Sequence, residues 1–198
     1  MVEGAPDRRG FPIVVSGPSG VGKTTIVQQV LESDPHVTYS VSVTTRPPRP
    51  GETSGDHYEF VDDEVFDELV RDGALAEWAE VHGYRYGTRA SVIREGLDLG
   101  SDVIMDLDVQ GGMSIKRLFP EALLIFIEPP SREELEERLR GRATDGEEVI
   151  AQRLANAIGE LEWSSRYDEQ VTNNDLDETV ETVLEKIAER RARPDGAD

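Results

Sequence analysis

One eight-residue motif constrains the fold of this chain more than any other feature. Residues 17–24, Gly-Pro-Ser-Gly-Val-Gly-Lys-Thr, match the G-x-x-x-x-G-K-[ST] pattern of a phosphate-binding loop. The apolar run PIVVSG (12–17) leads into the motif, and the segment 23–31 after it carries apolar residues at helical spacing. Because such a loop joins a buried strand to the start of a helix, the motif predicts an α/β fold with a nucleotide-phosphate site.

The residue types of this loop suit a triphosphate. Glycines let backbone N–H groups approach phosphate oxygens without a Cβ clash, and the start of a helix favours anions. We expect Lys23 to reach the β and γ phosphates of ATP and the hydroxyl of Thr24 to hold Mg²⁺, the expected cofactor. The residues predicted to bind ATP here are Gly17, Pro18, Ser19, Gly20, Val21, Gly22, Lys23, Thr24 and Thr25.

The rest of the chain alternates strand and helix patterns. VIMDLD (103–108) and ALLIFI (122–127) are further buried strands, and each precedes a helical pattern. Ser131 and Glu134 form a capping box behind the second strand. This order predicts an α/β fold with a P-loop NTPase-type parallel sheet and helices on both faces.

Two segments interrupt that rhythm. In 38–88, TYSVSVTT predicts a half-buried strand, a Pro-rich stretch follows, and LAEWAEVHGYRYG predicts another strand, so we expect a small inserted mixed α+β lobe. The polar stretch GRATDGEE is typical of a mobile lid. The expected division is a disordered extension 1–10, a domain 11–190 and a frayed tail 191–198; within the domain the core is 11–37, 89–140 and 166–190, the lobe 38–88 and the lid region 141–165.

Composition limits the partners. Lys and Arg number 21 against 41 Asp and Glu, and the net charge of −20 argues against nucleic-acid polymers and anionic membranes. With no Cys and three His, disulfides, thiolate nucleophiles and zinc sites are not expected. Neither a signal peptide nor a membrane-spanning run is apparent, so we expect a soluble, cytoplasmic protein that is either a monomer or a homo-oligomer. Adaptation to high salt stays open.

Two carboxylates stand at the end of the strand at 103–107. Asp106 and Asp108 are two residues apart, so on a strand they point the same way, beside the phosphate loop. We predict that they hold Mg²⁺ or its waters. For each Asp the alternative is a cap on the next turn before Gly111.

The inserted lobe carries a stiff basic stretch, Arg46-Pro-Pro-Arg49-Pro. In a polyproline helix of about three residues per turn, both arginines face the same side. Two guanidinium forks held together suit a phosphate monoester. A solvent-exposed Arg-Pro loop is the alternative.

Glu77 is a carboxylate on the predicted apolar face of a strand, in step with Leu75, Ala79 and Val81. Its two oxygens match the N1–H and N2–H₂ donors of guanine, a pair that adenine lacks. Ser42 and Thr88 are expected to add contacts to the base. Tyr58 and Tyr86 are expected to contact its phosphate. The alternative for Glu77 is an ion pair with an Arg of the same lobe.

From about residue 11 to 190 the chain resembles guanylate kinase. The resemblance rests on SGPSGVGKTT, SVSVTTRPPRPGE with GDHYEF, AEWAEVHGYRYGT, DLDVQGG, RLRGRATDGEEVIAQRL and NND, in the family's order. It implies that a core, a lobe and a lid close around ATP and GMP. The GMP-contacting positions that it implies are Ser42, Arg46, Arg49, Tyr58, Glu77, Tyr86, Thr88 and Asp108; those approaching the phosphates from the lid are Arg138, Arg142 and Arg153; and Asn173 lies near adenine or is a turn residue.

Phosphoryl transfer to GMP needs no general base, because the second phosphate pKa is about 6. Catalysis would come from positioning and from Lys23, Mg²⁺ and the lid arginines. Three rivals remain: a kinase for AMP or dTMP, a binding module that resembles the family without catalysis, and a regulatory GTPase. The intact Gly22, Lys23 and Thr24 argue against the binding module. The Arg-Pro lobe and the lid arginines argue against the regulatory GTPase, which has no evident use for them.

Overall fold

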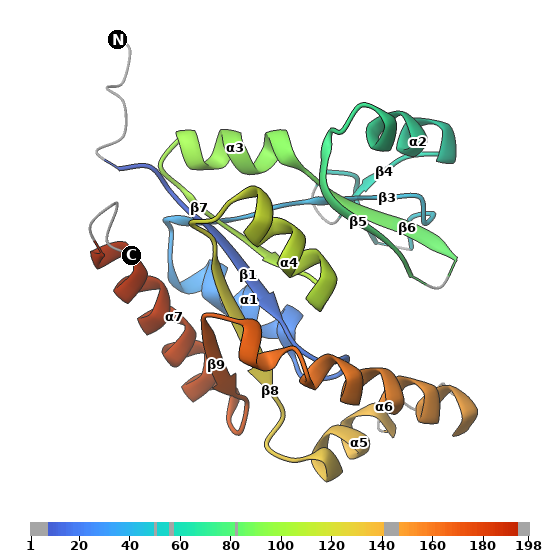
Figure 1. Cartoon of the computed structure of the whole chain (residues 1–198), viewed down its shortest axis with the longest axis vertical. Helices are drawn as coiled ribbons and strands as arrows, with labels where there is room; N and C mark the ends of the chain where they lie inside the picture. The colour runs from blue at the N-terminus through green and yellow to red at the C-terminus, as the bar shows by residue number, and fades with distance from the viewer. Residues whose placement is uncertain (1–7, 50, 56–57, 82, 141–146, 194–198) are drawn as a thin grey trace.

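The computed structural model describes residues 8–193 except 50, 56–57, 82 and 141–146. The chain builds two separate sheets, a five-stranded sheet in the core and a four-stranded sheet in the lobe (Figure 1). Within the described residues, no helix combines the length and the apolar character needed to cross a membrane.

The core sheet is entirely parallel and has the strand order β2-β7-β1-β8-β9. Its strands are β1 (Pro12–Ser16), β2 (Val37–Tyr39), β7 (Asp102–Asp106), β8 (Leu123–Glu128) and β9 (Glu169–Thr172). All five residues of β1 are buried, as expected for a central strand covered on both faces. The predicted fold class is confirmed.

Strand alternation divides the core into two layers. Val15 and Ile125 face a cluster that includes Val183 of α7 (Leu176–Ala192), beside α1 (Lys23–Ser33). Val14 points the opposite way, into a cluster that α3 (Ala90–Asp98) and α4 (Val109–Leu118) complete. Because side chains alternate along a strand, one short apolar run supplies both clusters.

Helices α5 (Arg132–Arg140) and α6 (Glu147–Leu161) form an arm beyond β8 (Figure 1), and a 3₁₀ turn, η1 (Ser164–Arg166), follows. The hydroxyl of Ser131 accepts a 3.1 Å hydrogen bond from the backbone N–H of Glu134, which is one half of the predicted capping box, whereas the carboxylate of Glu134 pairs with Arg138 at 2.6 Å. Leu135, Leu139 and Ala157 hold the two helices together in a small apolar cluster of their own. The arm is thus anchored separately from the main core.

The lobe sheet has the order β4-β3-β6-β5, and its elements are β3 (Ser42–Thr44), β4 (Tyr58–Phe60), α2 (Asp63–Arg71), β5 (Leu75–Val81) and β6 (Tyr84–Arg89). Two strand predictions are wrong here. The segment 38–45 is divided between β2 of the core sheet and β3 of the lobe sheet. The segment 75–87 is an antiparallel pair, β5 with β6, in place of one strand.

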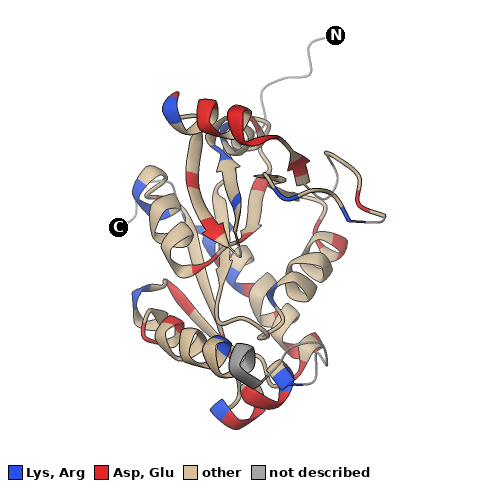
Figure 2. Cartoon of the chain, turned by 90° about the vertical axis from the view of Figure 1, so that its right-hand side faces the viewer, with Lys and Arg blue, Asp and Glu red and all other residues tan. Residues whose placement is uncertain are grey.

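The two ends differ from expectation where the structure describes them. Arg8, assigned above to a disordered extension, donates two hydrogen bonds of 2.8 and 3.0 Å to the buried carboxylate of Asp102. Arg191, assigned to a frayed tail, lies in α7 and donates to Asp102 at 2.6 Å. The acidic residues are not confined to one region: Figure 2 shows Asp and Glu on helices at both ends of the molecule.

Candidate active site

The phosphate loop joins β1 to α1, as the motif predicts. Gly17, Gly20 and Gly22 have φ angles of +143°, +88° and +103°, a region that favours glycine. A Cβ on Gly17 would lie 2.3 Å from the carbonyl oxygen of Ile127. At this position the motif glycine is therefore required both by its backbone conformation and by the closeness of β8.

Lys23, the first residue of α1, folds back over the loop. Its Nζ donates to the carbonyl oxygens of Gly17 and Pro18, at 2.6 and 3.2 Å. The ammonium group therefore lies over the loop itself, within the site that the motif predicts for phosphates.

Thr24 and Asp106 meet beside the loop. The hydroxyl of Thr24 donates to Oδ2 of Asp106 at 3.0 Å, and the phenol of Tyr39 donates to Oδ1 at 2.8 Å. Burial, with a smaller contribution from Asp106, raises the pKa of Tyr39 and keeps this donor protonated. The strand end thus presents a carboxylate whose two oxygens are both oriented.

These oxygen atoms suit Mg²⁺. In the part of the chain that the structure describes, no three His, Asp or Glu side chains gather as a metal cage. Mg²⁺ in nucleotide sites typically uses only one or two protein oxygens, together with phosphates and waters. A threonine hydroxyl beside one carboxylate, as at Thr24 and Asp106, fits that pattern.

Asp108 does not lie on the strand, contrary to the prediction. β7 ends at Asp106, and Asp108 is the N-cap of α4, where its Oδ1 accepts from the backbone N–H groups of Gln110 and Gly111 at 2.9 and 2.8 Å. The capping alternative therefore describes Asp108 correctly. Its side chain still lines the same cavity as Asp106.

A cavity of about 180 Å³ lies between the lobe and the end of β7. Its walls combine three tyrosines, three carboxylates, one serine and three apolar residues. They are Tyr39, Tyr58, Tyr86, Glu77, Asp106, Asp108, Ser42, Ala79, Val81 and Leu107. Six of the residues predicted to contact GMP or the metal are thus brought together: Ser42, Tyr58, Glu77, Tyr86, Asp106 and Asp108.

Glu77 faces this cavity from β5. Oε1 accepts a 2.6 Å hydrogen bond from the hydroxyl of Thr88, a fully buried residue directly opposite on β6. Burial, and next the negative charge of Asp108, raise the pKa of Glu77 to about 7, while the bond from Thr88 opposes the rise. Among the described residues no Arg or Lys forms a salt bridge with Glu77, so the ion-pair alternative is not what the structure shows.

Arg46 is 7% exposed and packs against Tyr58, one of the residues that line this cavity. Its guanidinium stacks on Tyr58, 5.3 Å from the ring centroid, and donates to both carboxylate oxygens of Glu52 at 2.9 and 2.8 Å. Arg49 is exposed, and its backbone N–H donates to the same carboxylate at 2.7 Å. Neither arginine lines the cavity, and Arg46 is already paired with an anion.

A second pocket, of about 280 Å³, opens on the other side of the phosphate loop. It is lined by Gly20, Val21, Gly22, Thr25, Arg138, Asn173, Asn174 and Leu176. The side-chain amide of Asn173 donates to the carbonyl of Val21 at 2.8 Å and accepts from Thr179 at 3.1 Å. Asn173 therefore ties the loop to α7, a structural role that the sequence did not indicate.

The three lid-side arginines are in different situations. Arg138 of α5 pairs with Glu134 at 2.6 Å and donates to the carbonyl of Asn173 at 3.3 Å, which brings it to the phosphate loop. Arg153 is half-buried on α6. Arg142 lies outside the described residues.

Sequence reasoning missed Glu160, near the end of α6. This carboxylate accepts a hydrogen bond from the backbone N–H of Ser19 and lies close to Lys23, although burial raises its pKa. Its Oε2 is buried and has no hydrogen-bond partner among the described residues. Glu52 and Tyr39 were also missed. Glu160 thus lies close to the position at which the loop is predicted to bind phosphates.

Comparison with known proteins identifies the family to which the chain is similar. The family model "Guanylate kinase" matches residues 9–190. The chain is 50% identical to a guanylate kinase of Syntrophotalea carbinolica over 177 residues, 88% of this chain and 83% of that protein. It is 45% identical to one of Sphingopyxis alaskensis, covering 94% and 86%. The crystal structure of guanylate kinase from Anaplasma phagocytophilum aligns with a TM-score of 0.77 at 33% identity, covering 94% and 88%.

Proposed function

The chain belongs to the guanylate kinase family, and from this premise we propose that it transfers the γ-phosphoryl group of ATP to GMP, giving ADP and GDP. The reaction depends on Mg²⁺ and serves purine nucleotide metabolism. ATP occupies the phosphate loop, and GMP occupies the cavity that Glu77 lines.

One observation carries the proposal: Asp106 belongs to both halves of the site. Its carboxylate accepts from Thr24 of the phosphate loop at 3.0 Å, and the same side chain lines the cavity that holds Glu77. A donor on the loop and an acceptor in the cavity would therefore meet at Asp106. In-line transfer between two nucleotides requires this end-to-end arrangement.

Glu77 selects guanine in this proposal. Its ionised carboxylate accepts from the N1–H and N2–H₂ groups of the base, and Thr88 fixes its orientation beforehand. Adenine offers no such donor pair on that edge, so AMP would leave the buried carboxylate unsatisfied. Ser42 adds a contact to the base, and Arg46, Arg49, Tyr58 and Tyr86 bind the GMP phosphate.

The loop lysine and the lid arginines neutralise the transferred group. Lys23 turns from the carbonyls of Gly17 and Pro18 to the β and γ phosphates, while Arg138, Arg142 and Arg153 approach from the lid side. Thr24 and Asp106 would hold Mg²⁺, which would supply positive charge to offset that of the phosphates. Adenine occupies the pocket beside Asn173.

No residue need act as a general base. The attacking GMP oxygen is already deprotonated at neutral pH, because the second pKa of a phosphate monoester is about 6. Glu77 contacts the base of GMP in this proposal, so the raised pKa of its carboxyl has no part in activating the nucleophile.

An acceptor comparison tests the proposal. ADP formation is measured in a coupled assay with ATP and GMP, AMP, dTMP or UMP in turn, first with the wild-type chain and then with Glu77→Gln. We expect turnover of GMP alone, and a loss in GMP kcat/KM of roughly 100-fold for Glu77→Gln, since a charged hydrogen bond is removed. Equal use of AMP would refute guanine selection, and no turnover of any acceptor would favour a binding module.

A further inference from the structure

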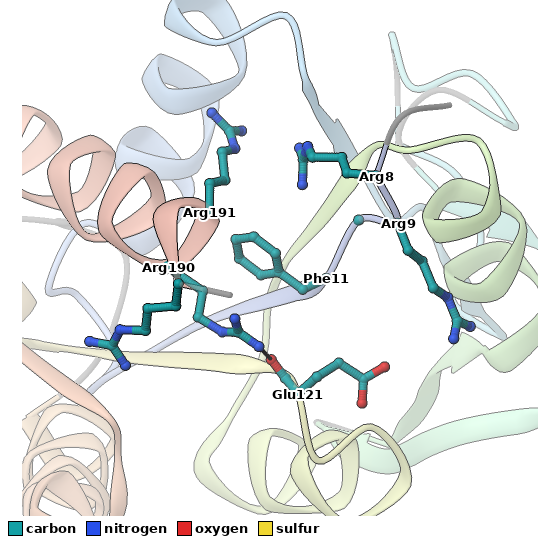
Figure 3. A pocket seen from close by; sticks show the side chains of 8 residues that line it. Arg8, Arg9, Phe11, Glu121, Arg190 and Arg191 are labelled. Atoms are coloured by element: carbon teal, nitrogen blue, oxygen red, sulfur yellow. Dashed lines mark hydrogen bonds between the residues drawn. The ribbon is translucent and has the colours of Figure 1, made fainter. Parts of the chain in front are cut away.

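An arginine-lined pocket of about 450 Å³ lies away from the phosphate loop. Its lining is Arg8, Arg9, Gly10, Phe11, Glu121, Arg190, Arg191 and Arg193 (Figure 3). Phe11 directly precedes β1 and Gly17 directly follows it, so the pocket and the phosphate loop lie at opposite ends of one buried strand. The function proposed above makes no use of this pocket.

One buried carboxylate, that of Asp102, holds two of these arginines in place. Arg8 forms a two-pronged pair with Asp102, whose side chain is completely buried. Arg191 donates to Asp102 and to Asp34, at 2.6 Å in each case. In Figure 3 the two guanidinium groups lie on the same side of Phe11. Their positions are therefore fixed before any ligand arrives.

The other arginines have weaker partners. Arg190 donates to the backbone carbonyl of Glu121 at 3.2 Å and lies 5.2 Å from the ring centroid of Phe11. Within the described residues, no salt bridge joins Arg190 or Arg193 to a carboxylate. Among the residues that the structure describes, Arg9 forms one salt bridge, with Asp98 at 3.5 Å, and both side chains are largely exposed. These charges are available to an anion.

One arginine of the pocket lining also carries an unsatisfied donor. Nη2 of Arg191 is buried and has no hydrogen-bond partner in the described part of the chain. Because this N–H group has no exposed surface, it adds positive charge behind the pocket lining but is not itself a contact for an anion in the pocket.

Charge and position set this cluster apart. The pocket is lined by five arginines, against one lining carboxylate, Glu121, and three aspartates that pair with the arginines, Asp34, Asp98 and Asp102. Positive charges therefore outnumber negative charges here, although the whole chain has a net charge of −20. The last turn of α7 accounts for Arg190 and Arg191, because cations are favoured at helix C-termini. It does not account for Arg8 and Arg9, which come from the other end of the chain.

We propose that this pocket is a second anion site, distinct from the active site, and that it binds a linear polyphosphate chain. Several guanidinium groups around one cavity suit an anion with several phosphates. The pocket offers little to a nucleobase: its one aromatic ring, Phe11, is 5% exposed and lies under Arg190. The ligand class is thus the phosphate chain itself, without a nucleoside.

Binding of tripolyphosphate to the full chain tests this proposal by titration calorimetry without added Mg²⁺. All proteins carry Lys23→Ala, so that any residual binding at the phosphate loop is common to the series. We expect Arg190→Gln combined with Arg193→Gln to weaken the pocket affinity about tenfold or more, because two charge-assisted contacts are lost. Both substitutions leave the pairs of Asp102 intact.

Two matched variants complete the test. Glu121→Gln removes the negative charge of the pocket without changing its shape and should tighten binding by roughly twofold to fivefold. Arg71→Gln, an exposed arginine at the end of α2, should leave binding unchanged. Unchanged affinity in both the double arginine variant and Glu121→Gln would overturn the proposal. So would tighter binding of ATP than of tripolyphosphate at this pocket, since that would assign a nucleotide site.

Discussion

The hydroxyl of Thr88 donates a hydrogen bond of 2.6 Å to the carboxyl group of Glu77 on the neighbouring strand, and Thr88 itself is fully buried. The bond orients Glu77 toward the cavity, and burial at the same time disfavours its charge. The side chain assigned to guanine recognition is therefore well placed but only partly ionised near pH 7.

GMP binding should depend on pH through this residue. Because the pKa of Glu77 is raised to about 7, its carboxylate predominates above pH 7 and is lost as the pH falls below it. We expect the KM for GMP to rise roughly fourfold from pH 8 to pH 6.5, since only the carboxylate accepts both guanine donors. Initial rates across this range measure it, and Glu77→Gln should show a much flatter profile. An equally steep profile in Glu77→Gln would assign the effect to another group.

Glu77→Gln should also stabilise the fold at high pH. A carboxyl whose folded pKa lies above its unfolded value loses stability as the pH rises between the two, from the model-compound value of 4.5 to about 7. The variant lacks this loss, so its free energy of unfolding should exceed that of the wild type by roughly 1–3 kcal/mol at pH 8. Near pH 4 the two should be alike. Urea unfolding at both pH values measures the difference, and a gain that persists at pH 4 would contradict the explanation.

Arg46→Lys should weaken GMP binding more than it slows turnover. Arg46 is buried, stacked on Tyr58 and held in a two-pronged pair with Glu52. Lysine cannot reproduce the planar fork, so we expect the KM for GMP to rise roughly tenfold to 100-fold while kcat changes less. Steady-state kinetics at saturating ATP separate the two constants. Arg71→Lys serves as the control at an exposed site, and an unaltered KM in Arg46→Lys would remove the residue from phosphate binding.

Thr24→Val should raise the requirement for magnesium. The substitution keeps the shape of the side chain but removes the hydroxyl that donates to Asp106 at 3.0 Å. We expect the concentration of free Mg²⁺ at half-maximal rate to increase about tenfold, since one protein oxygen ligand is lost. Thr24→Ser retains the hydroxyl and should behave like the wild type. Complete removal of Mg²⁺ with EDTA should abolish turnover, and activity that survives it would exclude the proposed metal role.

Glu160→Gln should tighten ATP binding in the absence of GMP. In the structure this carboxylate accepts from the N–H of Ser19 and stands close to Lys23, two groups that the phosphates need. Removing its charge should lower the Kd of ATP by roughly threefold to tenfold. Fluorescence or calorimetric titration measures the change, with Glu162→Gln, an exposed neighbour, as the control. Weaker binding would mean that Glu160 supports the loop conformation instead of competing with the ligand.

The core could be predicted from sequence because its strands are covered on both faces. PIVVS and LLIFIE are continuous apolar runs. The first is followed by the glycine-rich motif and the second by the helix cap at Ser131, so each run is best explained as a buried strand that leads to a helix. The lobe was harder, because alternation shows that a strand exists but not which sheet it joins. The break at Ser40 depends on a bond from its N–H to the carbonyl of Ile104, a tertiary contact. The turn between β5 and β6 depends on Gly83, whose φ is +79°.

The candidate site divides in the same way. Lys23, Thr24 and Glu77 were found because a motif or an out-of-place charge marks them in the sequence. Glu160 and Asn173 approach the phosphate loop from distant segments, and only the packing of α6 and α7 brings them there. Asp108 was misplaced by two residues, since nothing local shows that β7 ends before it.

The two-sheet architecture has a mechanical consequence. In the part of the chain that the structure describes, the backbone passes between the sheets twice, at Ser40–Val41 after β2 and at the junction of Arg89 with Ala90, where β6 gives way to α3. These two crossings are the covalent connections between the lobe and the core. A rotation of the lobe about the line that joins these crossings would leave the backbone hydrogen bonds of both sheets intact and would change chiefly the packing of β5 on α4.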